Sequence, residues 1–392
     1  MLLNNGVGSF LGYNLNGSAR NTAIGDLNGD NLNDIVSVTE TFNTGIQVVL
    51  ARPNGSLSEP ITLPYLGLIT DAKIFDANRD GRNDLIMTRS NGSGNGSLIL
   101  WPGNGDGTFG TAIEYTVGVG ARKVVLADMN RDNRPDALVL NQTAATVSIL
   151  LGTDTGFSSF ATVNAPGGVD LLVTNLNGDG AADPVTVNQA GGSLFERYGA
   201  GNGTFTGIVN RTADTADPVS VRTGDLNNDG RVDLIVTFLN TSQVRILRND
   251  GSLGNSPSGT AIMIGVNIAT GGAALDVALS DLNGDGRPDI ALPLRNQNRV
   301  QVLVNGGNFS FPTSTTYATD AGPIVIEAGL VGADNRPDLV INNSITRTLT
   351  ILTNCTVFSS VRILPLTSLT VAAWQPSSLT AVASLFTPTG YA

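Results

Sequence analysis

Short apolar runs recur along the whole chain, and each follows a polar segment rich in Asp, Asn and Gly. The runs are dominated by β-branched residues and leucine, as in Ile35-Val36-Ser37-Val38 and Leu85-Ile86-Met87. After a polar turn a second run follows, as in Ile46-Gln47-Val48-Val49-Leu50. This pattern predicts short β-strands joined by tight turns, and we find no 3.6-residue periodicity that would indicate helices.

The polar segment before each first run is a nine-residue motif, Asp-x-Asn-x-Asp-(Gly/Asn)-x-x-Asp. Copies begin at residues 26, 76, 128, 175, 225 and 281, and a degenerate seventh copy covers residues 329–338. A unit of about 50 residues that contains four short strands is typical of one propeller blade, whereas a parallel β-helix has a shorter repeat. The sequence therefore predicts an all-β, seven-bladed β-propeller of four-stranded antiparallel blades over residues 1–362.

The nine-residue motif has the composition of a Ca²⁺ loop. Ca²⁺ takes six to eight oxygen ligands, and the motif offers side-chain oxygens at positions one, three, five and nine and a backbone carbonyl at position seven. Position six is always Gly or Asn, the residues that most easily adopt φ > 0 in a sharp turn. The candidate ligands are Asp26, Asn28, Asp30, Leu32, Asp34, Asp76, Asn78, Asp80, Arg82, Asp84, Asp128, Asn130, Asp132, Arg134, Asp136, Asn175, Asn177, Asp179, Ala181, Asp183, Asp225, Asn227, Asp229, Arg231, Asp233, Asp281, Asn283, Asp285, Arg287 and Asp289.

Two copies depart from the motif. The fourth begins with Asn175 in place of Asp, which predicts a weaker but viable site. The seventh has Gly329 and Val331 where oxygen donors belong and keeps only Asp334 and Asp338. We expect about six structural Ca²⁺ ions and little or no metal in the seventh loop.

The composition excludes several kinds of chemistry. The chain has 392 residues, no His and one Cys, Cys355, so His-based catalysis, His-ligated zinc and an intrachain disulfide are excluded. The formal net charge of −11 argues against a nucleic-acid partner, but more than half of the 33 acidic residues occupy loop positions that six cations would neutralise. No run of 18 apolar residues indicates membrane insertion.

The loops, together with the hairpin segment Gly103-Asn104-Gly105-Asp106-Gly107-Thr108-Phe109, resemble the FG-GAP/VCBS repeat family, which includes the integrin α-subunit head and many secreted bacterial proteins. The resemblance covers roughly residues 2–360. It implies a ring of blades in which the ion loop joins the first and second strands. Family members serve in adhesion, in carbohydrate binding and as non-catalytic parts of surface enzymes.

The two ends of the chain carry separate expectations. Residues 2–19 match the later part of a repeat, so we expect them to pair with the last blade and close the ring. The N-terminal residues lack the basic region and long apolar core of a signal peptide. Residues 363–392 are uncharged; they are a linker or the start of an immunoglobulin-like domain, or alternatively a strand for self-assembly with another chain.

Three classes of function follow. The first is a non-catalytic recognition or adhesion module that binds an extracellular protein or glycan. The second is a structural subunit of an extracellular assembly or filament, and the third is a polysaccharide lyase or hydrolase, or its accessory domain. The chain has no His, and most of its carboxylates are assigned to the loops; both observations argue against an enzyme. Weak Ca²⁺ sites require a calcium-rich compartment, which predicts a secreted or cell-surface protein.

Overall fold

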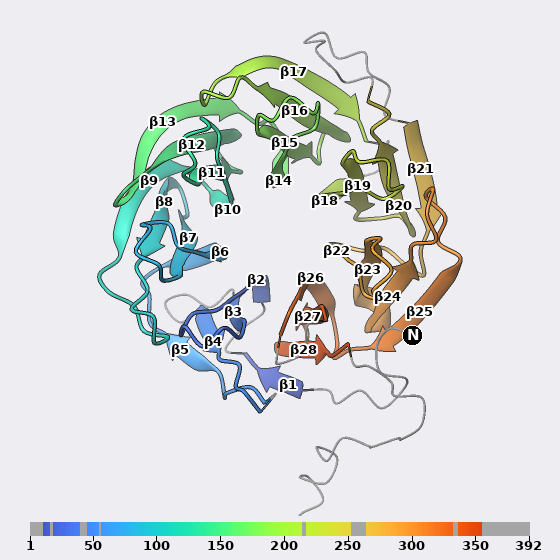
Figure 1. Ribbon diagram of the computed structural model, residues 1–392, viewed down its shortest axis with the longest axis horizontal. Helices are drawn as coiled ribbons and strands as arrows, with labels where there is room; N and C mark the ends of the chain where they lie inside the picture. The colour runs from blue at the N-terminus through green and yellow to red at the C-terminus, as the bar shows by residue number, and fades with distance from the viewer. Residues whose placement is uncertain are drawn as a thin grey trace, which may run out of the picture.

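Seven four-stranded antiparallel sheets surround a central axis as the blades of a β-propeller (Figure 1). The computed structural model describes residues 11–15, 19–39, 45–54, 56–213, 217–251, 264–331 and 336–354. This architecture confirms the prediction of an all-β, seven-bladed fold. Within those residues, no helix has the length and apolar character needed to span a bilayer.

The strands follow one another through each blade from the axis outward. Blades one to three contain β2 (Ala19–Gly25), β3 (Asp34–Thr39), β4 (Ile46–Val49), β5 (Ile61–Leu63), β6 (Leu68–Phe75), β7 (Asp84–Asn91), β8 (Gly94–Trp101), β9 (Ile113–Val119), β10 (Ala121–Ala127), β11 (Asp136–Asn141), β12 (Thr146–Thr153) and β13 (Gly156–Asn164). Blades four to six contain β14 (Gly168–Thr174), β15 (Asp183–Asn188), β16 (Ser193–Gly199), β17 (Phe205–Thr212), β18 (Pro218–Gly224), β19 (Asp233–Phe238), β20 (Gln243–Arg248), β21 (Ile264–Ala269), β22 (Ala278–Ser280), β23 (Asp289–Leu294), β24 (Arg299–Val304) and β25 (Thr313–Ala318). A 3-10 turn, η1 (Arg295–Gln297), joins β23 to β24.

The hydrophobic core is divided among the interfaces between neighbouring blades. Seven clusters of buried side chains lie between blades, one at each interface of the ring; the cluster between blades one and two, for example, joins Val36 and Val48 to Leu85 and Met87. The second strands β3, β11, β19 and β23 are buried at every residue. Both faces of these strands pack against apolar neighbours, which explains their nearly continuous apolar sequences.

The seventh blade is built from both ends of the described chain. It contains β26 (Pro323–Gly329), β27 (Asp338–Asn343) and β28 (Thr348–Leu352), and its outer strand is β1 (Leu11–Asn14), which pairs antiparallel with β28. The buried side chain of Leu15 then joins the cluster between blades seven and one. Within the N-terminal segment predicted to close the ring, residues 11–14 therefore form the closing strand, while residues 2–10 lie outside the described part.

Deleting residues 1–15 tests this closure. The deletion removes β1 and the buried Leu15 and leaves the outer edge of β28 unpaired, so we expect the Tm to fall by roughly 5–10 °C. Differential scanning calorimetry measures the change, and a variant lacking only residues 1–10 is the matched control because it keeps β1. An unchanged Tm for the longer deletion would contradict a closing role for this strand.

Three sequence-based expectations fall outside the described residues. These are the C-terminal segment 363–392, the single Cys355, and the central part of the degenerate seventh loop, with Asp334.

Candidate functional site

Each nine-residue loop joins the first strand of its blade to the second. Position nine is the first residue of the second strand in all seven blades, from Asp34 at the start of β3 to Asp338 at the start of β27. The inner strands run in the same direction around the ring, so the loops project from one face of the propeller. This location agrees with the one that the family resemblance implies.

Position six of the loop is left-handed in all six complete copies. The φ angles are 63° at Asn31, 84° at Gly81, 63° at Asn133, 82° at Gly180, 82° at Gly230 and 84° at Gly286. These values confirm the steric reason for Gly or Asn at that position.

Position four is also left-handed, which the sequence interpretation missed. The residues there are Gly29, Arg79, Arg131, Gly178, Asn228 and Gly284, with φ between 61° and 78°. Glycine at position four in three copies and asparagine in another are the sequence features that could have indicated a left-handed residue there. Arg79 and Arg131 hold this conformation despite a Cβ atom, which strains the backbone.

Replacing Arg79 with Gly should relieve that strain. We expect Arg79→Gly to raise the free energy of unfolding by roughly 0.5–1 kcal/mol, measured by urea denaturation, because Gly occupies φ > 0 without a Cβ clash. Gly178→Ala is the matched control at the same position of another loop. Its added Cβ would meet no atom within 4 Å, so a loss of stability there reports strain alone. A destabilised Arg79→Gly variant would contradict the argument.

Hydrogen bonds wind each loop around its own carboxylates. In the first loop, Oδ1 of Asp26 accepts the amide of Gly29 at 2.7 Å and Oδ2 accepts the amide of Asn31 at 2.8 Å. Oδ1 of Asp30 accepts the amide of Leu32 at 2.9 Å. The bond from position six to position one recurs in the second, third, fifth and sixth loops. No such bond reaches Asn175 among the described contacts, and the weaker metal site expected in the fourth loop stays a prediction.

The position-nine carboxylate has a structural role that the sequence interpretation did not include. Oδ2 of Asp34 accepts the amide of Leu27, at position two, and Oδ1 accepts the amide of Ala51 beyond the third strand, both at 2.8 Å. The same pair of bonds occurs at the other six aspartates, which are Asp84, Asp136, Asp183, Asp233, Asp289 and Asp338. This explains why the seventh loop keeps Asp338 although Gly329 and Val331 replace the oxygen donors at positions one and three.

Burial affects the acidity of these aspartates. It raises the pKa of Asp34 to about 6, and the charges of Asp30 and Asp26 add to the effect although the amide bonds of Leu27 and Ala51 oppose it. Burial likewise raises the pKa of Asp183 and of Asp233 to about 6. Each aspartate oxygen can accept a second partner, so its ligation of a cation, as proposed from the sequence, stays a prediction.

The donor chemistry of the loops fits Ca²⁺. Positions one, three, five and seven supply carboxylate, amide and carbonyl oxygens within a single wound turn, and Ca²⁺ prefers such oxygens. Across the described ranges, no three acidic, His or Cys side chains converge into a metal cluster. Each complete loop offers a mixed set of oxygens, with neutral donors beside carboxylates at positions one and five, or at position five alone in the fourth loop.

A second feature lies at the centre of the ring, where the innermost segments of all seven blades enclose a cavity of about 370 Å³. Its wall combines charges of both signs, and the charged residues are Arg20, Asp71, Arg122, Lys123, Asp170, Arg222, Asp276 and Glu327. In six blades the inner strand has a register shift at the same place, for example between Ala121 and Lys123. Bulges of this kind redirect side chains, and here they accompany the residues that line the cavity.

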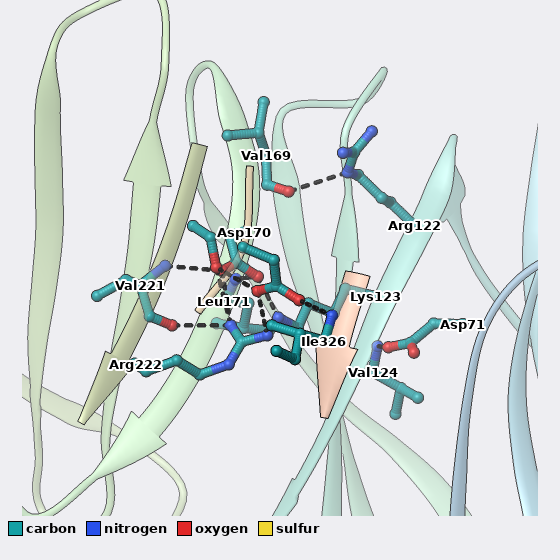
Figure 2. A network of polar contacts seen from close by, with 12 residues as sticks. Asp71, Arg122, Lys123, Val124, Val169, Asp170, Leu171, Val221, Arg222 and Ile326 are labelled. Carbon is teal, nitrogen blue, oxygen red and sulfur yellow. Dashed lines mark hydrogen bonds and ion pairs between the residues drawn. The ribbon is translucent and has the colours of Figure 1, made fainter. Parts of the chain in front are cut away.

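Asp170 is the hub of this central network (Figure 2). It forms ion pairs with Lys123 of blade three and with Arg222 of blade five, the latter with an Oδ2–Nη1 distance of 3.2 Å. Arg222 also pairs with Asp276 of blade six, with an Nη2–Oδ1 distance of 2.7 Å. Burial would raise the pKa of Asp170, but Lys123 and Arg222 outweigh it and lower the pKa to about 2.

Aspartates of alternate blades also bond to the backbone of the next blade. The amide of Val124 donates to Asp71 at 2.8 Å, that of Val221 to Asp170 at 2.9 Å, and that of Ile326 to Asp276 at 3.2 Å. Blades two, four and six are thereby joined to blades three, five and seven. These carboxylates hold the ring together, and their sequence separation from their partners hid them from the sequence interpretation.

Comparison with known proteins places the fold in context. The family model described as FG-GAP-like repeat matches residues 26–87, 76–139, 175–236, 231–292 and 281–341. No curated protein sequence matches the chain.

Several solved structures are similar at low sequence identity. A lectin of Agrocybe aegerita, described as recognising non-reducing terminal N-acetylglucosamine, is 18% identical over 78% of this chain and 81% of its own, with a TM-score of 0.56. BBS1N, solved in complex with ARL6DN, is 12% identical over 89% and 95%, with a TM-score of 0.62. A functionally unknown protein from Desulfotomaculum acetoxidans is 13% identical over 84% and 90%, with a TM-score of 0.54. These similarities support the fold.

Proposed function

Since the chain belongs to the FG-GAP-like repeat family, we propose that it is a non-catalytic recognition module, stabilised by Ca²⁺, that binds a protein or glycan ligand outside the cell. The observation that carries this proposal is the state of the central aspartates. Asp71, Asp170 and Asp276 each accept a backbone amide from the next blade, and the last two are also ion-paired. Such groups hold a rigid scaffold together.

The glutamates support the same conclusion. Glu114 is ion-paired with Arg89 at 2.5 Å, and Glu196 with Arg211 at 2.5 Å. Glu327 is half-buried at the central cavity, where desolvation raises its pKa, Lys73 and Arg222 oppose the shift, and the charge of Asp276 adds to it. A glycosidase needs two carboxyl groups that face one bond of the substrate. Glu114 and Glu196 are instead each held by an arginine, and Glu327 shares the central cavity with aspartates that accept backbone amides of the next blade.

Calcium would act through the six complete loops. Positions one, three and five would hold the ion through side chains and position seven through its carbonyl. In the five loops with Asp at positions one and five, the ion would also offset the repulsion between these two carboxylates. At the roughly millimolar Ca²⁺ found outside cells, sites with Kd of about 10⁻⁴–10⁻³ M are substantially filled. This is the reason for placing the protein in an extracellular compartment.

The recognition role is supported by the rigid ring and by the lectin with the same fold, which is described as recognising a terminal sugar. Fold alone does not determine function, so the test has to be direct. A glycan array and a panel of extracellular matrix proteins, probed with and without chelator, should reveal binding to a defined class of ligand that depends on Ca²⁺. Turnover of a polysaccharide would overturn the proposal, and concentration-dependent filaments without ligand binding would favour a structural subunit.

A further inference from the structure

The groove between blades three and four contains a pocket of about 510 Å³. One wall comes from the end of β13, at Thr162, Val163 and Asn164, and the other comes from β16 and β17. The second wall contains Arg197, Phe205, Thr206, Gly207 and Ile208. The pocket is separate from the central cavity and from the nine-residue loops.

Alternation along β16 directs Arg197 into this groove. Leu194 and Tyr198 belong to the apolar cluster shared with blade five, and Glu196 faces the same side. The side chain of Arg197 points to the opposite face of the strand, toward blade three. There its Nη2 donates a hydrogen bond to the backbone carbonyl of Asn164. The guanidinium thus lies at the pocket between the two blades.

Arg197 is a buried cation to which no carboxylate in the described part of the chain is paired. Arg197 is 2% exposed, and its buried Nη1 has no hydrogen-bond partner. Burial lowers its pKa and no neighbouring acid opposes the shift. None of the eight described residues around the pocket is Asp or Glu.

Two half-buried arginines of the ring, by contrast, are paired with carboxylates. Arg211, on the adjacent strand β17, makes a two-pronged contact with Glu196 through Nε at 2.5 Å and Nη2 at 2.9 Å. Arg222 is shared between Asp170 and Asp276. Because a guanidinium stays charged in proteins and an unpaired buried charge is strongly unfavourable, the unpaired Arg197 indicates a site that an anion completes.

The rest of the lining narrows the class of anion. The planar guanidinium matches the two oxygens of a carboxylate. Thr162, Asn164 and Thr206 offer hydroxyl and amide groups, while Phe205 and the 55% exposed Ile208 offer apolar contact at the pocket. A volume of this size suits one or two sugar rings and is small for a peptide segment. We propose that this pocket binds an acidic sugar through its carboxylate, with Arg197 as the specificity-determining residue.

This site rests on the proposed recognition function and names its ligand class. Isothermal titration of the full chain with glucuronate should show one binding event, and glucose, the neutral sugar of the same ring, should bind roughly ten- to a hundredfold more weakly. Arg197→Met should weaken glucuronate binding by a similar factor and leave the weak binding of glucose unchanged. Arg299→Met, at an exposed arginine far along the chain, is the matched control and should bind as the parent does.

The Tm in the absence of sugar separates a binding role from a structural one. Arg197→Met should keep or raise the Tm, since it removes an unpaired charge, and glucuronate should raise the Tm of the parent only. Equal affinity for glucuronate and glucose, equal affinity for acetate, or no glucuronate binding at all would each overturn the inference. A neutral ligand found on the arrays would leave the recognition function standing without this pocket, whereas absence of any ligand would remove both.

Discussion

Chelation of Ca²⁺ is expected to lower the free energy of unfolding by roughly 2–8 kcal/mol. At about millimolar Ca²⁺, a site with a Kd of about 10⁻⁴–10⁻³ M contributes roughly 0.4–1.4 kcal/mol, and six loops contribute together. A total of this size approaches the whole stability margin of an ordinary domain. Chemical denaturation with Ca²⁺, with chelator, and with Mg²⁺ measures the effect, and Mg²⁺ should restore little of it because it requires a tighter octahedral site.

Two substitutions in the sixth loop separate the metal from the scaffold. Asp285, at position five, accepts amides only from within the loop, whereas Asp289, at position nine, joins the loop to the end of the third strand. Asp285→Asn should reduce the Ca²⁺-dependent part of the stability, while Asp289→Asn should lower stability with and without Ca²⁺. Equal denaturation midpoints with Ca²⁺ and with chelator in the parent protein would contradict the metal's stabilising role.

Replacing Asp170 with Ala is expected to cost about 3–5 kcal/mol. The substitution leaves Lys123 and Arg222 without their shared carboxylate inside the ring and removes the acceptor for the amide of Val221. Urea denaturation measures the loss. Asp154→Ala is the matched control, because Asp154 forms an ion pair of 2.7 Å with Arg134 but its side chain is 76% exposed. Such surface pairs contribute little, so similar losses in the two variants would contradict the assigned role of the central network.

The pH dependence of this network follows from the same carboxyl group. Because the folded-state pKa of Asp170 is lowered from 3.8 to about 2, its contribution is fully present above the unfolded pKa. It is lost as the pH falls from about 4 to about 2. In that range the parent should lose more stability than Asp170→Ala does.

The fold was predictable because its information is local and repeated. Alternating apolar residues and the recurrence of the nine-residue loop about every 50 residues predict the strands and the number of blades without any long-range contact. The left-handed position six was predictable for the same reason, since Gly and Asn mark it in each copy. Position four was hidden by Arg79 and Arg131, which adopt the strained conformation that the fold imposes.

The site features that depend on ring geometry were not predictable. The partner of Asp34 at Ala51 lies beyond the third strand, and Arg222 meets Asp276 from a blade that is separated by 54 residues in the chain. In the sequence, Lys123 stands at the start of an apolar run, and no local pattern shows that it faces the axis. Arg197 is similarly ordinary in sequence, because a missing partner is visible only once the neighbouring blade is in place.

The number of bound Ca²⁺ ions tests the central claim most directly. Equilibrium dialysis of the metal-free chain against millimolar Ca²⁺, followed by elemental analysis, should give about six Ca²⁺ per chain, as the six complete loops predict. The Asp285→Asn variant should bind one ion fewer or bind that ion much more weakly. A stoichiometry near zero, with the ring still folded, would contradict the assignment of these loops as calcium sites.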